Sequence, residues 1–125
     1  MNYGANVNIK NDEGDTPLHM ASKINSIELV KLLSNYKAKI DITNNKGETP
    51  LHFSCLYISS LEKEVIKYLI KHGADINKAE KYGNTPLIFL SYDPNESKNI
   101  ELLIKNGADI NKSNNKGENT IIYSY

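Results

Sequence analysis

The stretch Gly14-Asp15-Thr16-Pro17-Leu18-His19 returns as Gly47-Glu48-Thr49-Pro50-Leu51-His52 and again as Gly83-Asn84-Thr85-Pro86-Leu87-Ile88. The first interval is 33 residues and the second is 36, and a degenerate copy, Gly117-Glu118-Asn119-Thr120-Ile121, follows after 34 more. A six-residue motif at a nearly constant period predicts a stack of similar units instead of one closed globule. Such a stack offers a long surface for holding another molecule and no natural place for a buried catalytic centre.

The composition of the 125-residue chain argues against several classes of function. The formal net charge is zero and all 15 basic residues are lysine, so neither a global field nor bidentate arginine contacts favour nucleic acid or an anionic membrane. No apolar run approaches the roughly 20 residues that span a bilayer. Cys55 is the single cysteine, which suits a reducing intracellular compartment, the cytoplasm or nucleus. Asn, Lys and Ile supply 47 residues, and this bias indicates an AT-rich source such as a parasite, an intracellular bacterium or a large DNA virus, for which host cytoplasm is an alternative.

Each copy of the motif has the residues that open a helix. Gly14 lies in a polar turn where glycine is free to take a positive φ. Thr16 is predicted to be the N-cap, and Pro17 the first helical residue, where its missing N–H costs nothing. Further along, apolar residues at helical spacing predict a second, longer helix: Ile27, Leu29, Val30, Leu32 and Leu33. Each unit is therefore predicted to be turn, short helix, loop, longer helix and return.

The second helix of each unit is predicted to end at a residue with positive φ. Gly73 and Gly107 occupy this position in the later units, where glycine accepts the reversal of the chain. Lys37 occupies it in the first unit, and a non-glycine residue there should cost about 1 kcal/mol.

One pair of short helices buries too little apolar surface to be stable alone, so neighbouring units must stack. We expect three ladders of side chains at equivalent positions, namely Leu18, Leu51 and Leu87; Leu32, Tyr68 and Leu102; and Leu33, Leu69 and Leu103.

The motif, the period and the glycine pattern closely resemble the ankyrin repeat. Thr16–Ala21 matches the helix opening Thr-Pro-Leu-His-x-Ala of that family almost in full, and 73–77, 107–111 and 4–8 resemble its helix exit Gly-Ala-Asp-x-Asn. The resemblance implies an all-α solenoid of stacked helix-turn-helix units joined by β-turn or hairpin fingers. It divides the chain into one array with a partial unit at 1–10, full units at 11–43, 44–79 and 80–113, and a partial unit at 114–125.

The departures from the family pattern are in the loops and at the ends. The second unit carries about three extra residues within 57–61, and the third has Pro94 in the stretch 92–97, which bars helix continuity. We expect both loops between the helices to be longer than normal. The chain starts at a helix exit and stops at Tyr125 within a first helix, whose residues 121–123 would cover the third unit; this predicts a fragment or worn end of a longer array, and the alternative is a complete small protein with eroded ends.

His19 and His52 invite a metal or catalytic interpretation. They occupy the same position in successive units, and stacked helices lie about 8–10 Å apart, whereas the ligands of one zinc lie about 2 Å from the metal. Ile88 stands at the matching position of the third unit, so the resemblance favours a structural histidine that steadies its turn and the adjacent unit. Cys55 is predicted to be a small buried hydrophobe. We expect no catalytic residues, no cofactor and no metal.

The resemblance places the binding positions at the turn tips and on the exposed side of the first helices, where Phe53 and Phe89 also fall. Tyr57, Tyr82 and Tyr92 lie in the middle of the array with charged tips around them, the usual anatomy of a protein-binding patch. The alternative is that these tyrosines merely cover loosely packed loops. The candidate partner-binding residues are Asp12, Glu13, Asp15, Lys23, Ile24, Lys46, Glu48, Leu56, Tyr57, Lys81, Tyr82, Asn84 and Tyr92.

The leading hypothesis is a monomeric, non-enzymatic module that binds another protein through the concave surface of turn tips and first helices. The alternative is a substrate-recruiting segment of a larger protein, such as a ubiquitin-ligase adaptor, a pathogen effector or an enzyme. Asn77 and Asn111 also resemble the context in which ankyrin asparagines are hydroxylated, although bonding within their own turns is the simpler interpretation.

Overall fold

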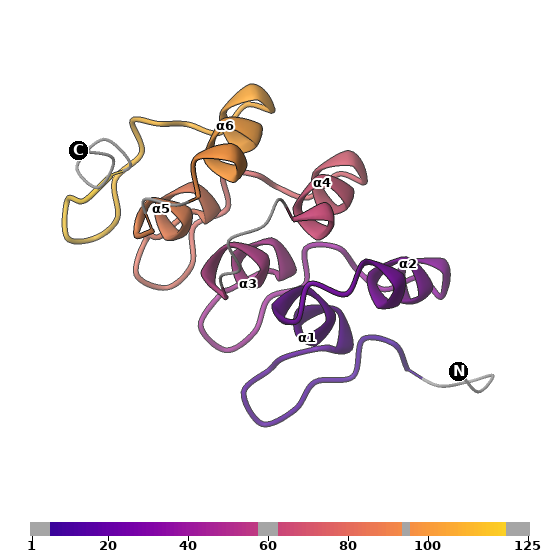
Figure 1. The fold of residues 1–125 in the computed structure, drawn as a ribbon. Helices are drawn as coiled ribbons and strands as arrows, with labels where there is room; N and C mark the ends of the chain where they lie inside the picture. The colour runs from indigo at the N-terminus through magenta and orange to yellow at the C-terminus, as the bar shows by residue number, and fades with distance from the viewer. Residues whose placement is uncertain (1–5, 58–62, 94–95, 120–125) are drawn as a thin grey trace.

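The computed structural model describes residues 6–57, 63–93 and 96–119, and these form three pairs of helices (Figure 1). The pairs are α1 (Pro17–Lys23) with α2 (Ile27–Asn35), α3 (Pro50–Leu56) with α4 (Glu64–Lys71), and α5 (Pro86–Ser91) with α6 (Ser97–Lys105). An inner row contains α1, α3 and α5, and an outer row contains α2, α4 and α6. All regular secondary structure in the described ranges is helical, which confirms the prediction of an all-α solenoid.

The three inner helices begin as the motif predicts. The hydroxyls of Thr16, Thr49 and Thr85 each accept a hydrogen bond from the backbone N–H three residues further on, and proline follows each threonine. In α1 and α3 the histidine ring returns the bond by accepting the N–H of the threonine, which completes a capping box. The cap therefore satisfies the backbone donors that a helix start leaves open.

The chain forms four tight turns, which we call fingers 1 to 4, at 11–15, 44–48, 80–84 and 114–118. Each of fingers 1 to 3 precedes an inner helix, and finger 4 lies near the end of the described chain. In finger 1 the N–H of Gly14 donates to the carbonyl of Asn11 over 2.9 Å, and φ of Gly14 is +81°. A Cβ atom added to Gly14 would lie 2.6 Å from the side-chain oxygen of Asn45 and 2.7 Å from its backbone nitrogen. Finger 1 thus needs glycine both for its φ and for the close approach of finger 2.

Successive fingers are joined by one backbone hydrogen bond at a constant register. The N–H of Asn45 donates to the carbonyl of Glu13 over 3.0 Å, and the equivalent N–H groups of fingers 3 and 4 donate to Lys46 over 2.8 Å and to Tyr82 over 2.9 Å. The three accepting residues are acidic, basic and aromatic. The contact therefore depends on the backbone alone.

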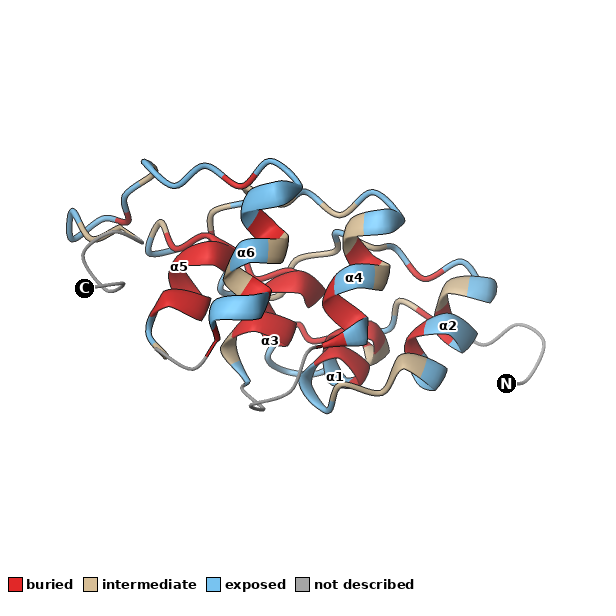
Figure 2. Cartoon of the chain, turned by 45° about the horizontal axis from the view of Figure 1, so that its top comes forward, coloured by how far each residue is buried: buried red, intermediate tan, exposed pale blue. Residues whose placement is uncertain are grey.

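The core lies between the two rows of helices, where buried residues face one another (Figure 2). The ladder of Leu18, Leu51 and Leu87 is confirmed, and so is that of Leu33, Leu69 and Leu103; all six are at most 4% exposed. The third ladder was predicted wrongly, because Leu32 is 42% exposed and Tyr68 and Leu102 are only half-buried. Adjacent residues of a helix point about 100° apart, so burial of position 33 turns position 32 toward the edge of the outer row.

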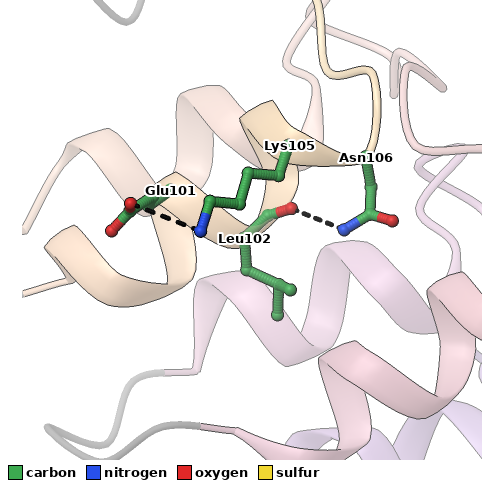
Figure 3. Close-up of polar contacts among 4 residues, drawn as sticks. All are labelled: Glu101, Leu102, Lys105 and Asn106. Atoms are coloured by element: carbon green, nitrogen blue, oxygen red, sulfur yellow. Dashed lines mark hydrogen bonds and ion pairs between the residues drawn. The ribbon is translucent and has the colours of Figure 1, made fainter.

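Each outer helix is followed by the residue with positive φ that the sequence predicted. Lys37 has φ of +68°, whereas Gly73 and Gly107 have φ of +95° and +100°. After α6, the side chain of Asn106 donates to the carbonyl of Leu102 over 2.8 Å (Figure 3). The same exposed end of α6 carries the ion pair of Lys105 with Glu101, at 3.6 Å.

The two lengthened loops are confirmed by the helix bounds. Residues 24–26 connect α1 to α2, whereas residues 57–63 connect α3 to α4 and residues 92–96 connect α5 to α6. The predicted position of the extra residues and Pro94 fall mostly outside the described residues, as do 121–123.

The lengthened loops end in a buried polar cluster that the sequence analysis missed. Lys63 and Glu96 are the N-cap residues of α4 and α6, and neither side chain caps its own helix. Both are at most 2% exposed, as is Asn99. Asn99 accepts the backbone N–H of Lys63 over 3.4 Å and donates to a carboxylate oxygen of Glu96 over 2.7 Å. The cluster therefore ties the start of α4 to the start of α6.

The ammonium group of Lys63 reaches the end of the neighbouring inner helix. It donates to the backbone carbonyls of Ser54 and Tyr57, the second over 2.9 Å. Burial lowers the pKa of Lys63, and the nearby charge of Glu96 opposes that shift. Lys63 thus supplies hydrogen-bond donors where α3 ends, and it fixes the backbone from which Tyr57 projects.

Candidate partner-binding surface

The structure places the thirteen candidate residues at three depths. Exposed residues are Asp12, Glu13, Lys23, Ile24, Lys46, Tyr57, Lys81, Tyr82 and Tyr92, and Leu56 is half-buried. Asp15, Glu48 and Asn84 are only 8%, 7% and 9% exposed, so their placement at open turn tips was wrong. They stand directly before the capping threonine, where the chain turns inward to begin a helix.

A cavity of about 420 Å³, which we call gap 1, lies between fingers 1 and 2. Its walls include the carboxylates of four residues, Asp12, Glu13, Asp15 and Glu48, and the ammonium group of Lys46. The side-chain amide of Asn44 donates to Asp15 and to Glu48, over 2.9 Å in each case. Two of the four carboxylates are therefore held in fixed positions.

The aromatic wall of gap 1 is built from α3. Phe53 and Tyr57 line the cavity, and their rings meet edge to face at 5.2 Å between centroids. Phe53 is only 4% exposed and packs on the ring of His19 at 4.9 Å, so its predicted position on the exposed side was wrong. Phe89 is likewise buried, against His52 at 5.5 Å. Tyr57 is 40% exposed and is the ring that a partner can reach.

A cavity of about 270 Å³, which we call gap 2, lies between fingers 3 and 4. Tyr82 and Tyr92 line it together with Asn84, which accepts hydrogen bonds from the Tyr92 hydroxyl over 3.2 Å and from the amide of Asn114 over 2.9 Å. Burial raises the pKa of the Tyr92 hydroxyl. The charged groups in its lining are one ammonium, of Lys116, and one carboxylate, of Glu118.

Both ring nitrogens of His19 and of His52 make structural hydrogen bonds. Nδ1 of His19 accepts the backbone N–H of Thr16 over 3.1 Å, and Nε2 lies 2.8 Å from the carbonyl of Glu48 in the next unit. His52 repeats this arrangement with Thr49 and with Asn84. An N–H faces Nδ1 and a carbonyl faces Nε2, so both rings are neutral with the proton on Nε2. The structural interpretation of the histidines is confirmed.

Burial opposes protonation of both motif histidines. Burial lowers the pKa of His52 to about 4, and burial also lowers the pKa of His19. Cys55 is fully buried, as predicted, and burial raises the pKa of its thiol. Within the described ranges, no three His, Cys, Asp or Glu side chains come together as a group that could hold a metal ion.

Comparison with known protein families identifies the family of this chain. A family profile described as ankyrin repeats (3 copies) matches residues 1–80 and 56–114. The chain belongs to the ankyrin-repeat family. Ankyrin repeats are generally protein–protein interaction modules, and the family is typically non-enzymatic. Among the residues that the structure describes, no helix of this ankyrin array has the length and apolar character needed to cross a membrane.

One curated relative is the ankyrin repeat and SAM domain-containing protein 6 of Rattus norvegicus. It is 32% identical over 91 residues, which cover 71% of this ankyrin chain and 10% of the relative. The chain therefore spans about a tenth of the length of that protein.

The exit asparagine of the second unit joins units instead of closing its own turn. The side-chain oxygen of Asn77 accepts the N–H of Asp109 over 2.8 Å, and its amide donates to the carbonyl of Gly107 over 3.1 Å. Bonding within its own turn was therefore the wrong interpretation for the Asn77 side chain. A signal for such inter-unit roles was present in the repeat, because Asp15, Glu48 and Asn84 are polar at one constant position.

Proposed function

We propose that this ankyrin array binds a partner protein through the concave surface formed by the four fingers and by α1, α3 and α5. One observation carries the proposal: gap 1 and gap 2 both open between fingers, and each has an exposed tyrosine in its wall. Aromatic side chains within a polar surround are the usual energetic centre of a protein interface. Membership of the ankyrin-repeat family supports protein binding in general, and the tyrosines of the two gaps support the concave surface as the place of binding.

The outer row is a poorer candidate for the same role. A hollow of about 300 Å³ lies between α2 and α4, and its tyrosine, Tyr68, already packs on His72 at 4.0 Å between ring centroids. Tyr57, Tyr82 and Tyr92 are 40%, 54% and 42% exposed, and they lie at the end of α3, in finger 3 and at the end of α5. A partner that contacts all three would cover the middle of the concave face.

The test replaces these three tyrosines with alanine together. Peptides are first selected from a random phage-displayed library on the unmodified protein, and their affinities are then measured by titration. The triple variant should bind at least tenfold more weakly, because a single interface anchor can contribute about 2 kcal/mol. Tyr36→Ala is the matched control, since Tyr36 is 45% exposed at the end of α2 and lines neither gap. Equal affinity of the triple variant, or an equal loss in the control, would reject the concave surface. Thermal unfolding of each variant shows whether the stack is intact.

A second candidate is that the array recruits substrates for a larger multidomain protein, such as a ubiquitin-ligase adaptor, a pathogen effector or an enzyme. The rat relative favours this candidate, because the chain corresponds to only 10% of that protein. The full reading frame in the source genome tests it. A catalytic or ligase-docking domain in the same frame would support recruitment, and a frame that encodes only ankyrin repeats would reject it.

A further inference from the structure

We propose that gap 1 receives a lysine or arginine side chain of the partner, so that the array binds a segment that is basic at its finger-1 end. This proposal rests on the proposed function and adds the chemistry of the partner to it. Its basis is a cavity whose charge, aromatic wall and volume all fit a long cationic side chain, together with a second cavity in the same molecule that lacks the charge.

The charge of gap 1 is both concentrated and preorganised. Four carboxylates and one ammonium line the cavity, although the whole chain has a formal net charge of zero. Asp15 and Glu48 are held by the amide of Asn44, so their negative charge costs no rearrangement when a cation arrives. A cleft lined by one sign of charge concentrates the opposite charge in front of it.

The outer carboxylates of gap 1 are available to a partner. Asp12 and Glu13 are exposed, and within the described residues their side chains make no hydrogen bond and no ion pair. Their backbone groups are engaged instead: the two carbonyls accept from the side chain and the N–H of Asn45, and the N–H of Glu13 donates to the side-chain oxygen of Asn11. The cavity therefore has two exposed acidic side chains, Asp12 and Glu13, in addition to the two that Asn44 holds.

The aromatic residues that line gap 1 fit the rest of a basic side chain. Lysine and arginine pack their methylene stems along apolar surface while the charged head stays polar, and Phe53 and Tyr57 supply that surface. The ring of Tyr57 already attracts a cation, because the ammonium of Lys23 lies 4.7 Å from its centroid. The volume of about 420 Å³ lies within the range of ligand-binding pockets.

Gap 2 resembles gap 1 in its construction but not in its charge. It is built on the same finger framework, with two tyrosines in its wall, but one carboxylate balances one ammonium and the other polar groups are amides and phenols. The electrostatic attraction of a cationic side chain is therefore weaker in gap 2 than in gap 1. The two gaps therefore differ in the charge they select, and a bound segment is oriented by that difference.

The first experiment uses n-butylammonium as the probe for a lysine side chain, with butyramide and butyrate as the neutral and anionic controls. Amide chemical shifts of the protein are followed during each titration at constant ionic strength. The expected result is a saturable change confined to gap 1 with n-butylammonium alone. No saturable change, equal changes in both gaps, or the same response to butyramide would overturn the proposal.

The second experiment compares two variants that remove the same amount of charge. Asp12→Asn with Glu13→Gln neutralises the rim of gap 1, and Glu64→Gln with Glu101→Gln neutralises two exposed carboxylates of the outer helices. Library-selected peptides should carry a basic residue, and the rim variant should bind them about tenfold more weakly, an effect that shrinks at high salt. The outer variant should bind them unchanged.

The outcomes separate this inference from the proposed function. Peptides that depend on Tyr57, Tyr82 and Tyr92 but carry no basic residue, or that bind the rim variant equally well, would overturn the cationic occupant and leave the concave surface standing. Peptides that are indifferent to the three tyrosines would remove the proposed function itself, and the occupant of gap 1 with it.

Discussion

The two junctions between helix pairs share one contact and differ in another. The first junction joins α1 and α2 to α3 and α4, and the second joins α3 and α4 to α5 and α6. Each has a motif histidine that donates to a carbonyl of the next finger, over 2.8 Å from His19 and 3.0 Å from His52. Only the second contains the buried Lys63, Glu96 and Asn99.

The difference shows how an insertion changes the energetics of a repeat. The motif gives every junction a neutral contact between a side chain and the backbone, whereas the lengthened loops give the second junction two buried side chains of opposite charge, Lys63 and Glu96. Buried charges are strongly coupled, because removal of one leaves the other without compensation. The second junction is therefore the more sensitive to single substitutions.

The largest expected effect comes from Lys63→Ala. It leaves the Glu96 carboxylate buried without its counter-charge and removes a donor from the carbonyls of Ser54 and Tyr57. We expect a loss of about 3–5 kcal/mol in the free energy of unfolding by urea, with amide exchange rising first in α5 and α6. Lys31→Ala, on the exposed face of α2, should change stability by less than about 0.5 kcal/mol. Equal effects of both variants would show that the cluster carries no special weight.

The next effect is the pH dependence of both junctions. The pKa of His52 is about 4 in the folded chain against an ordinary value of 6.5, so between these pH values the unfolded chain binds more protons than the folded chain. Stability is then complete above pH 6.5 and falls as the pH drops toward 4, by about 3 kcal/mol from His52. Denaturant titrations at several pH values measure the slope. His52→Gln should flatten it more than His19→Gln, and an unchanged slope in His52→Gln would contradict the assignment.

A smaller effect, with the opposite sign, is expected in the first unit. Lys37 holds φ of +68°, a conformation that glycine adopts without penalty, as Gly73 and Gly107 do in the other units. Lys37→Gly should therefore raise the free energy of unfolding by about 1 kcal/mol. Lys39→Gly is the control, because the φ of Lys39 is not positive and glycine there adds only chain entropy to the unfolded state. A loss of stability in Lys37→Gly would mean that the lysine side chain contributes more than the strain costs.

The smallest effect sets the scale for an exposed charge pair. Glu101 and Lys105 are one helical turn apart on α6, with side chains 67% and 71% exposed. Glu101→Gln should cost no more than about 0.5 kcal/mol, and less at high salt. A value near that of Lys63→Ala would remove the distinction between exposed and buried charges on which the comparison of the junctions depends.

The motif predicted what is local and what repeats. Thr16 and Pro17 start a helix by their own chemistry, and the equivalent residues do so again in α3 and α5. Leu18 is buried because its position is buried in every unit. The family, the helix pairs and the left-handed Lys37 followed from such positions, and the lengthened loops followed from the places where the repeat departs from them.

The errors lie where the side chain of one unit meets the next. Lys63 lies in a buried cluster because Asn99, 36 residues away, accepts its backbone N–H, and a lone lysine in a loop has no local sign of that burial. Asp15 and Glu48 were placed at an open tip because they are charged, whereas the amide of Asn44 accommodates both. The orientation of α2 about its own axis, relative to the helices beside it, decides that Leu33 is buried and Leu32 is exposed.

The finger-to-finger hydrogen bonds also bear on how such a surface changes over generations. Glu13, Lys46 and Tyr82 accept the same backbone bond although their side chains have nothing in common. A substitution at one of these positions leaves the register of the neighbouring finger untouched. Mutation can therefore alter the chemistry of the concave face one residue at a time while the scaffold is inherited unchanged, so that recognition can diverge between descendants much faster than architecture.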